Sequence, residues 1–266
     1  MPTVTSKDGT KIAFDKVGAG PVVILVNGAM VHRSSNPTMA QLAELLGEHF
    51  TVYNYDRRGR GESGDTKPFT KAREIEDIQA LVEDAGGQAM IFGISSGGAV
   101  TLEATASILG ITRAVVYEVP FIVDNGRQPL PDYAERSTRL VEEGKLNELV
   151  EYWVMEVVGI PAEYVAGMKQ DQNMWGGMLT LAPTIPYDAA FVGEFMRGNP
   201  LPTDHWANLK VPVLVADGGA SDAWMGHAAD ALASVLPQAS RQTLKDQTHA
   251  VAPNVLAPVL IEFFKQ

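Results

Sequence analysis

Cysteine is absent from this chain of 266 residues, and its absence excludes several kinds of chemistry. The chain forms no disulfide, carries no thiolate nucleophile and offers no cysteine ligand to a metal ion. Positive charge is also scarce, because 21 Lys and Arg stand against 32 Asp and Glu, which gives a formal net charge of -11. An acidic surface repels phosphate backbones and anionic lipid headgroups, so we expect neither nucleic acid nor a membrane as a partner.

Long apolar runs are missing as well. The segment from Met1 to Gly9 has no apolar core of the signal-peptide type, and no later run is long enough to span a bilayer. We therefore expect a cytoplasmic protein. The composition itself is that of an ordinary globular protein, with 45% hydrophobic and 20% charged residues, and the length suffices for one large α/β domain.

Short apolar runs alternate with amphipathic stretches over much of the chain. Apolar and β-branched runs predict strands, and apolar residues at helical spacing predict helices. The predicted strands cover residues 3–5, 11–17, 21–26, 50–55, 89–92, 113–117, 211–216 and 241–244. The first predicted helix follows the N-cap Asn36. Further helices are predicted over 70–84, 99–107 and 223–236, and the last one is predicted to start from an N-cap at Asn254. This alternation indicates an α/β fold with a mostly parallel sheet flanked by helices.

The alternation stops between Glu118 and about residue 209, after the sixth predicted strand. Helical stretches are predicted there over 133–146, 149–158 and 162–178. They carry the side chains of Trp153, Met155, Met168, Met174, Trp175 and Met178. These side chains suit a helical lid over an apolar pocket, because methionine fills irregular space easily, but they also suit the core of the insertion itself. We expect a core of residues 1–120 and 205–266 and a helical cap of residues 121–204.

A charged, glycine-rich turn follows the strand at 50–55. It reads Asp56-Arg57-Arg58-Gly59-Arg60-Gly61-Glu62-Ser63-Gly64. The turn lacks the Lys-Ser/Thr pair of a phosphate-binding loop. We therefore interpret it as a structural turn whose arginines pair with nearby acidic residues.

The pentapeptide Gly93-Ile94-Ser95-Ser96-Gly97 is the strongest candidate for chemistry. It lies between a predicted strand and a predicted helix, which is the context in which Gly-x-Ser-x-Gly presents a serine nucleophile. A side chain on Gly93 or Gly97 would collide with the strand or helix beside it. The turn exposes the Ser95 hydroxyl and directs the Ser96 amide, at a helix N-terminus, toward negative charge forming beside Ser95.

A serine hydroxyl needs a base within hydrogen-bond reach, and the base needs a carboxylate to orient it. Of the five histidines, His249 lies in the loop between the last predicted strand and the final helix. We interpret the other four as surface or packing residues, although His32 follows the loop at 27–30 and could contact a substrate. The remaining three are His49, His205 and His227.

Taken together, these features resemble the α/β-hydrolase superfamily over nearly the whole chain. The matching pieces are Asn27-Gly28-Ala29-Met30, where the family often has His-Gly, the turn at 56–63, the elbow at 93–97 and Gln247-Thr248-His249. The resemblance implies that Ser95 is the nucleophile and His249 the general base, with no metal and no cofactor. It also implies an oxyanion hole formed by the amides of Ala29 and Ser96, with Met30 as the alternative to Ala29.

The acidic residue departs from the family's usual pattern. The family usually has Gly-x-x-Asp after the strand at 211–216, and Gly219-Ala220-Ser221-Asp222 has that spelling, but counting from Pro212 puts the usual position on Ser221. A minority of relatives, including lactonases of the zearalenone-hydrolase type, take a glutamate from the place that Glu118 occupies here. Those lactonases also share the Gly-x-Ser-Ser-Gly elbow.

Glu118 ends an otherwise apolar strand, where a buried carboxylate must have a partner. Asp222, by contrast, suits the N-cap of the helix that follows it. We therefore prefer Glu118 as the acid, with Asp222 second and Asp217 third.

The expected activity is hydrolysis of a carboxylic ester or lactone of a small to medium apolar substrate through an acyl-enzyme intermediate. The same residues also serve carbon–carbon bond hydrolases, cofactor-free haloperoxidases or perhydrolases, lyases and cyclases, and a ligand-binding protein on this scaffold is a further alternative. Dehalogenases and epoxide hydrolases of this fold use an aspartate nucleophile, so Ser95 argues against both.

Overall fold

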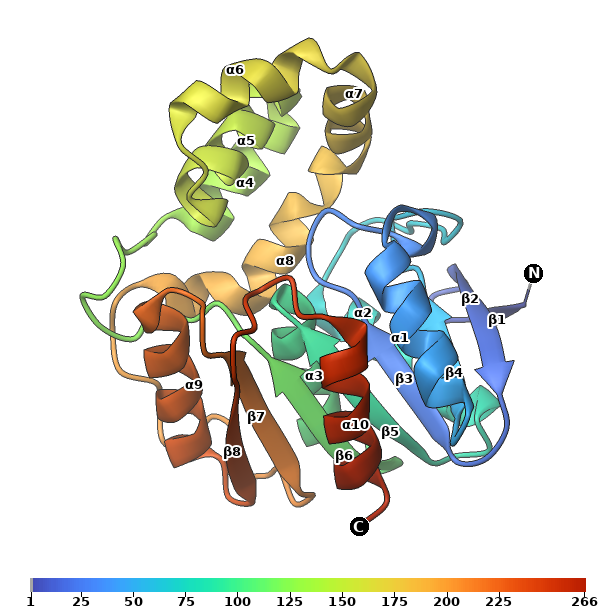
Figure 1. Ribbon diagram of the computed structural model, residues 1–266. Helices are drawn as coiled ribbons and strands as arrows, with labels where there is room; N and C mark the ends of the chain where they lie inside the picture. Colours follow the sequence, from blue (N-terminus) through green and yellow to red (C-terminus); the bar gives the residue numbers. More distant parts are fainter. Residues whose placement is uncertain (1) are drawn as a thin grey trace.

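An eight-stranded sheet forms the centre of the protein, and helices cover both of its faces (Figure 1). This computed structural model describes residues 2–266. The strand order is β1-β2-β4-β3-β5-β6-β7-β8; β2 pairs antiparallel with β1 and β4, and all other pairs are parallel. The strands are β1 (Thr3–Thr5), β2 (Lys11–Gly18), β3 (Val22–Val26), β4 (Thr51–Tyr55), β5 (Ala89–Ile94), β6 (Ile111–Tyr117), β7 (Val213–Gly218) and β8 (Ala239–Leu244). The predicted α/β class with a mostly parallel sheet is confirmed.

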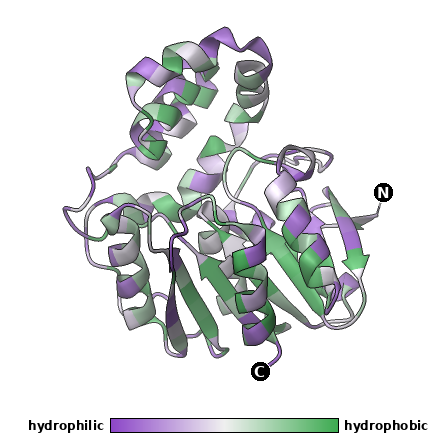
Figure 2. Ribbon diagram, in the orientation of Figure 1, coloured by the Kyte–Doolittle hydropathy of each residue, from purple (hydrophilic) through white to green (hydrophobic). Residues whose placement is uncertain are grey.

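The two faces of the sheet bury separate apolar clusters. Successive residues of β3 alternate between them, because neighbouring side chains of a strand point to opposite faces. Ile24 and Val26 pack toward α2 (Lys71–Asp84), α3 (Ser96–Ser107) and α9 (Ala223–Val235), whereas Val23 and Leu25 pack toward α1 (Pro37–Gly47) and α10 (Pro253–Phe264). Figure 2 shows hydrophobic central strands and a hydrophilic β8, which suits a strand at the sheet edge.

The segment between β6 and β7 is helical, as predicted, and lies over the edge where the parallel strands end (Figure 1). It contains α4 (Tyr133–Glu142), α5 (Leu146–Tyr152), α6 (Ala162–Gln170), α7 (Gln172–Leu181), α8 (Ile185–Val192), the π-helical η2 (Trp153–Val158), and the 3-10 turns η3 (Ala182–Thr184) and η4 (Gly193–Met196). A further 3-10 turn, η1 (Arg33–Ser35), precedes α1. The division into a core and a cap of residues 121–204 stays a prediction, and α8 packs against α2 and α3 of the expected core.

Two local predictions were wrong, and one helix was missed. The helix expected over 162–178 is broken at Asp171, whose carboxylate accepts hydrogen bonds from the first amides of α7 and starts a new helix. The final helix begins at Pro253, so Asn254 lies inside it and is not its cap, because proline is well suited to the first helical position. The helix α8 was not predicted at all.

Most of the Met and Trp side chains of the insertion pack into the apolar cluster on one face of the sheet, whereas Met174 is exposed. Trp175 is buried and donates from Nε1 to Asn147 Oδ1 at 2.8 Å. Met155, Met168 and Met178 pack against the same apolar cluster. Of the aromatic and methionine residues singled out in the sequence, Trp153 alone lines the cavity described below.

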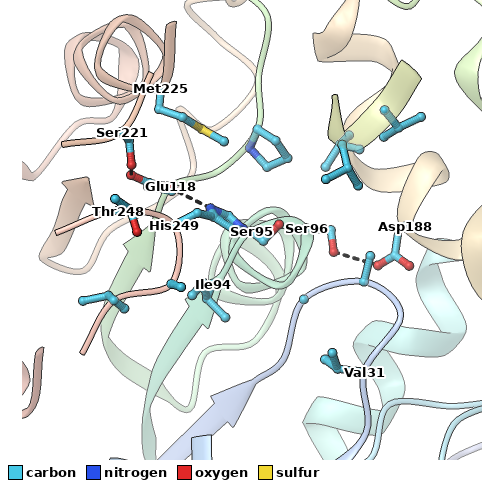
Figure 3. A pocket seen from close by; sticks show the side chains of 18 of the residues that line it. Val31, Ile94, Ser95, Ser96, Glu118, Asp188, Ser221, Met225, Thr248 and His249 are labelled. Atoms are coloured by element: carbon cyan, nitrogen blue, oxygen red, sulfur yellow. Dashed lines mark hydrogen bonds and ion pairs between the residues drawn. The ribbon is translucent and has the colours of Figure 1, made fainter. Parts of the chain in front are cut away.

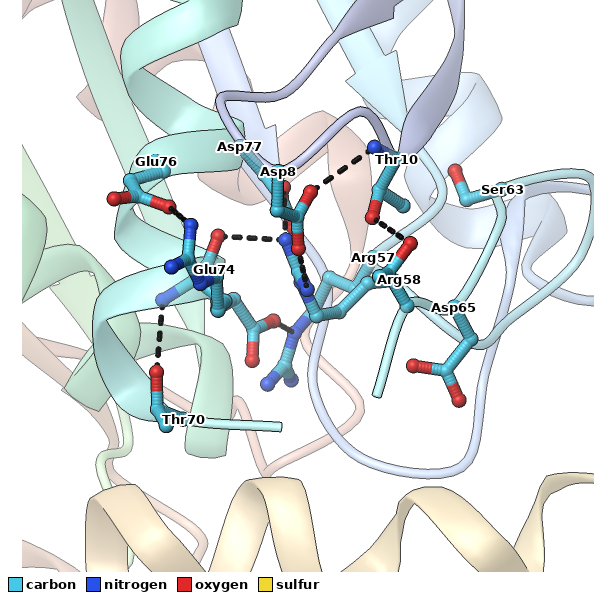
Figure 4. A network of polar contacts seen from close by, with 12 residues as sticks. Asp8, Thr10, Arg57, Arg58, Ser63, Asp65, Thr70, Glu74, Glu76 and Asp77 are labelled. Carbon is cyan, nitrogen blue, oxygen red and sulfur yellow. Dashed lines mark hydrogen bonds and ion pairs between the residues drawn. The ribbon is translucent and has the colours of Figure 1, made fainter. Parts of the chain in front are cut away.

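The arginine-rich turn at 56–64 is structural, as predicted. Figure 4 shows Arg57 and Arg58 among acidic residues of α2 and of the β1–β2 turn. Arg58 is fully buried and pairs with Asp77 at 2.6 Å and with Asp8 at 3.0 Å, while Arg57 pairs with Glu74. These ion pairs attach the turn to α2 and to the β1–β2 turn. In the described part of the chain, no helix combines the length and apolarity that a membrane span requires.

The close packing at the start of α3 leads to a first prediction. A Cβ on Gly97 would lie 2.5 Å from the Asn27 carbonyl oxygen, whereas a Cβ on Gly177 in α7 would meet nothing within 4 Å. We expect Gly97→Ala to lower the free energy of unfolding by more than about 2 kcal/mol. We expect Gly177→Ala to raise it by about 0.5–1 kcal/mol, because alanine favours a helix interior. Urea unfolding measures the free energy of unfolding of both variants. The same change in both would contradict the described packing around Gly97.

Candidate active site

A cavity of about 700 Å³ lies between the carboxyl edge of the sheet and the helical insertion. Its wall is mostly apolar and comes from the loop after β3, α1, the start of α3, η2, α8, α9 and the loop after β8. The apolar side chains that line it include Val31, Leu42, Ile94, Trp153, Val192, Met225 and Leu256. All five residues predicted for the site also line this cavity, namely Ala29, Ser95, Ser96, Glu118 and His249. Figure 3 labels the last four of them.

Ser95 lies on a strained turn between β5 and α3. Its φ of 58° and ψ of -133° lie in a region that side chains disfavour, and such strain persists only where surrounding contacts enforce it. The Ser95 amide donates to the Tyr117 carbonyl at 2.9 Å, and a Cβ on Gly93 would lie 2.8 Å from the carbonyl carbon of Gly97. The predicted need for glycine on both sides of the turn is therefore confirmed.

Glu118 and His249 meet at the wall of the cavity. His249 Nδ1 lies 2.8 Å from Glu118 Oε2, and Figure 3 shows the imidazole between the Glu118 carboxylate and Ser95. The Glu118 side chain is fully buried, whereas the His249 side chain is 46% exposed. The other carboxylate oxygen, Oε1, accepts from the Gly218 amide at 2.9 Å and from the Ser221 hydroxyl at 2.5 Å.

The loop that carries His249 is held by a second contact from β6. The Tyr117 hydroxyl donates to the Thr248 carbonyl at 2.8 Å. Burial raises the pKa of this hydroxyl above its ordinary value, and the charges of Glu118 and Asp217 add to the rise, so the group stays protonated and donates. Tyr117, the last residue of β6, therefore holds the backbone of this loop, and Glu118, the next residue, contacts the His249 ring.

The other two candidate acids have different surroundings. Asp217 pairs with Arg241 at 2.8 Å, with Arg241 Nη1 as the donor. Asp222 lies at the N-cap of α9 and at the cavity wall, but its side chain caps no amide and makes no hydrogen bond to His249 anywhere in residues 2–266. Ser221, which occupies the position where the family usually has its acid, instead donates to Glu118.

The loop after β3 passes close to Ser95. A Cβ on Gly28 would lie 3.0 Å from Ser95 Cβ and 3.6 Å from Ser95 Oγ. The Ala29 amide donates to no group within the described residues. The Ser96 amide belongs to the first turn of α3, where helix N–H groups lack partners inside the helix. Ala29 follows Gly28, which approaches the Ser95 side chain, and Met30, which the prediction kept as the alternative donor, follows Ala29 with a φ of 59°.

One residue of the site was missed in the sequence. Asp188 of α8 lines the cavity and is buried, with 1% exposure. Its Oδ1 accepts from Ser96 Oγ at 2.8 Å and from Arg57 Nη1 at 2.7 Å, and its Oδ2 accepts from Arg60 Nη2 at 2.5 Å. Burial would raise the pKa of Asp188, but the charges of Arg60 and Arg57 and the Ser96 hydrogen bond outweigh it and lower the pKa. A single carboxylate in the apolar stretch 185–192 was the signal that could have identified it, as it did for Glu118.

The remaining histidines pair with residues away from the cavity wall, in keeping with their predicted surface or packing roles. The contacts are His205 Nε2 to Glu103 at 2.8 Å, His227 Nδ1 to Asp124 at 2.8 Å, His49 Nδ1 to Lys265 at 3.2 Å and His32 Nδ1 to Ser34 at 3.0 Å. His32 is not among the residues that line the cavity. The described side chains contain no group of three or more His, Asp and Glu placed to hold a metal ion.

The contact between Ser221 and Glu118 leads to a second prediction. Ser221→Ala removes a donor from a buried carboxylate, so we expect a loss of about 1.5–3 kcal/mol in the free energy of unfolding. Ser234→Ala is the matched control, because the Ser234 hydroxyl donates to the Ala231 carbonyl on an exposed surface. Chemical denaturation distinguishes the two, and an equal, small loss in both would mean that Glu118 does not depend on Ser221.

Comparisons with known proteins agree with this architecture. Residues 23–258 match the model of a family described as "Alpha/beta hydrolase family". The crystal structure of an alpha/beta hydrolase from Sphaerobacter thermophilus DSM 20745 is similar over 99% of this chain and 100% of that chain, with 50% sequence identity and a TM-score of 0.87. The enol-lactonase from Burkholderia xenovorans LB400 is similar over 100% of both chains, with 20% identity and a TM-score of 0.73, which concerns the fold alone.

A sequence relative gives a more limited match. "Probable oxidoreductase EphD" of Mycobacterium tuberculosis is 36% identical over 84 residues. That match covers 30% of this chain and 14% of the mycobacterial protein, so it concerns a small part of that protein.

Proposed function

Because this chain belongs to the alpha/beta hydrolase family, we propose that it is a serine hydrolase that cleaves a carboxylic ester or a lactone of a small to medium apolar substrate. The observation that carries the proposal is the alignment of Glu118, His249 and Ser95 at the cavity wall. The 2.8 Å contact between Glu118 Oε2 and His249 Nδ1 leaves the other ring nitrogen, Nε2, for the Ser95 hydroxyl. Nucleophile, base and orienting acid then stand in the order that acyl transfer requires.

The reaction begins with Ser95. Its Oγ attacks the substrate carbonyl carbon while His249 Nε2 takes the hydroxyl proton. Glu118 accepts the hydrogen bond from Nδ1–H, which holds the ring in the required tautomer and stabilises its charged form. When the tetrahedral intermediate collapses, His249 returns the proton to the leaving alkoxide, and the acyl group stays on Ser95.

A water molecule completes the cycle. His249 removes a proton from the water, whose oxygen attacks the acyl carbon, and then returns a proton to Ser95 Oγ as the acid product leaves. In both tetrahedral intermediates, the oxyanion accepts hydrogen bonds from the amides of Ala29 and Ser96. The free Ala29 amide and the closeness of Gly28 to Ser95 support this assignment.

The character of the cavity supports an apolar substrate. Its volume of about 700 Å³ and its largely aliphatic and aromatic wall suit an acyl or alcohol group that is transferred out of water. Tyr133, Trp153 and Val192 come from the insertion and close one side of the cavity. We therefore assign residues 121–204 the role of a cap that shapes the apolar part of the site.

The third prediction tests the nucleophile and the base. Ser95→Ala and His249→Ala should each lower kcat/KM by about a thousandfold or more on p-nitrophenyl esters and on lactones, because neither can form the acyl-enzyme. His227→Ala is the matched control, since His227 pairs with Asp124 outside the cavity wall. The assay uses p-nitrophenyl esters of increasing acyl length together with unsubstituted lactones. Ester turnover that survives in folded Ser95→Ala would remove Ser95 from the mechanism.

The fourth prediction distinguishes the two leading candidate acids. Glu118→Gln should lower kcat by about a thousandfold, because the neutral amide neither stabilises charged His249 nor fixes its tautomer. Asp222→Asn should change kcat by less than about threefold, because in the described residues Asp222 makes no hydrogen bond to His249, whose Nδ1 pairs with Glu118. Both substitutions preserve side-chain size, so steady-state kinetics report the charge. The reverse ranking would assign the acid to Asp222 and refute this part of the proposal.

A further inference from the structure

Two buried arginines hold the backbone of the loop that passes beside Ser95. Arg60 Nη1 donates to the Gly28 carbonyl at 2.7 Å, and Arg57 Nη1 donates to the Asn27 carbonyl at 3.2 Å. Both arginine side chains are 1% exposed, and neither residue lines the cavity. The two carbonyl groups are therefore held from the protein interior.

The Gly28 carbonyl and the Ala29 amide belong to the same peptide unit. A trans peptide is planar, so its C=O and its N–H point in opposite directions. The one cis bond in the described chain is Lys67-Pro68, so the Gly28-Ala29 bond is trans. Because Arg60 holds the Gly28 oxygen toward the interior, the Ala29 N–H points the other way, toward the cavity that both residues line.

Arg60 is in turn held by the helical insertion. Its Nη2 donates to Asp188 Oδ2 at 2.5 Å, and its Nε donates to Thr184 Oγ1 at 3.2 Å. The other carboxylate oxygen of Asp188 accepts from the Ser96 hydroxyl at 2.8 Å, as the dashed line in Figure 3 shows. The Asp188 carboxylate thus contacts Ser96 directly. Through Arg60 it is also linked to the Gly28 carbonyl, which belongs to the same peptide unit as the Ala29 amide.

We propose that Arg60 and Asp188 are positioning residues for the oxyanion hole: Asp188 of α8 holds Arg60, and Arg60 orients the Gly28-Ala29 peptide so that the Ala29 N–H faces the reacting carbonyl. This inference rests on the proposed serine-hydrolase function. It assigns the insertion a part in catalysis as well as in substrate contact, because the donor geometry depends on a helix that lies between β6 and β7.

The charge of Asp188 suits this role. The two arginines and the Ser96 hydroxyl hold its pKa below the ordinary value of a carboxyl, so Asp188 stays ionised beside Arg60. Lysine cannot replace Arg60 fully, because one ammonium group cannot reproduce the planar fork that contacts the Gly28 carbonyl and Asp188 at once. Arg60→Lys therefore keeps the positive charge but loses the simultaneous contacts with the Gly28 carbonyl and Asp188.

The fifth prediction concerns Arg60→Lys and Asp188→Asn. Each should lower kcat for p-nitrophenyl butyrate by about 10- to 100-fold, somewhat less than the loss of a whole oxyanion donor, while KM changes by less than about twofold. The affinity for an alkyl trifluoromethyl ketone should fall by the same factor as kcat. In that complex Ser95 Oγ adds to the ketone carbon, its proton passes to His249, and the resulting oxyanion occupies the hole.

Asp77→Asn is the matched control. Asp77 is as deeply buried as Asp188 and pairs with Arg58 at 2.6 Å, but the hydrogen bonds of Arg58 go to Asp77, Asp8 and the Arg73 carbonyl, and none goes to the loop at 27–30 within the described residues. This variant should lose thermal stability and keep kcat and the ketone affinity of the wild type. A methyl ketone of the same chain length, which forms no stable adduct, should bind all variants equally.

The outcomes separate the inference from the function on which it rests. Wild-type kcat and ketone affinity in folded Arg60→Lys or folded Asp188→Asn would overturn the inference and leave the serine-hydrolase proposal standing. An equal loss of kcat in Asp77→Asn would also overturn it, since any destabilised buried ion pair would then suffice. If the folded Ser95→Ala variant hydrolysed the ester as fast as the wild type, the proposed function would be refuted, and the inference with it.

Discussion

A buried carboxylate must find hydrogen-bond donors, and at the end of β6 this constraint organises much of the molecule. Glu118 is 1% exposed, and it contacts the Gly218 amide, the Ser221 hydroxyl and the His249 ring. Those partners come from the end of β7, the turn before α9 and the loop after β8. One side chain therefore ties together the ends of three neighbouring strands, and in the proposed mechanism it also orients the base.

Asp188 imposes a similar constraint on the other side of Ser95. Arg57 and Arg60 satisfy it, and these arginines hold the carbonyls of Asn27 and Gly28. In the proposed mechanism, one buried carboxylate serves proton transfer and the other serves the oxyanion. The two differ in origin, because Glu118 follows a strand of the sheet whereas Asp188 belongs to the insertion.

Features that depend on a few neighbouring residues were predictable from the sequence. The elbow at 93–97, the histidine loop and the alternating strands have signatures of a few residues each, and the family match confirms the fold that they predict. The helix α8 has no such signature, because Asp188 is its one charged residue and its other residues give no polar face of the kind that identifies a surface helix. A lone carboxylate in this apolar stretch marks Asp188 in the sequence, but its pairing with Arg60 could not be predicted, because the two residues are 128 positions apart along the chain.

Fluorophosphonate labelling of the wild-type protein, followed by mass mapping of the modified peptide, tests the central claim most directly. The reagent phosphonylates a serine only where a base activates the hydroxyl and an oxyanion hole receives the phosphoryl oxygen. The account predicts rapid, stoichiometric modification of Ser95 and of no other residue. A folded protein that remains unmodified, or that is modified at a different residue, would contradict the assignment of Ser95 as an activated nucleophile.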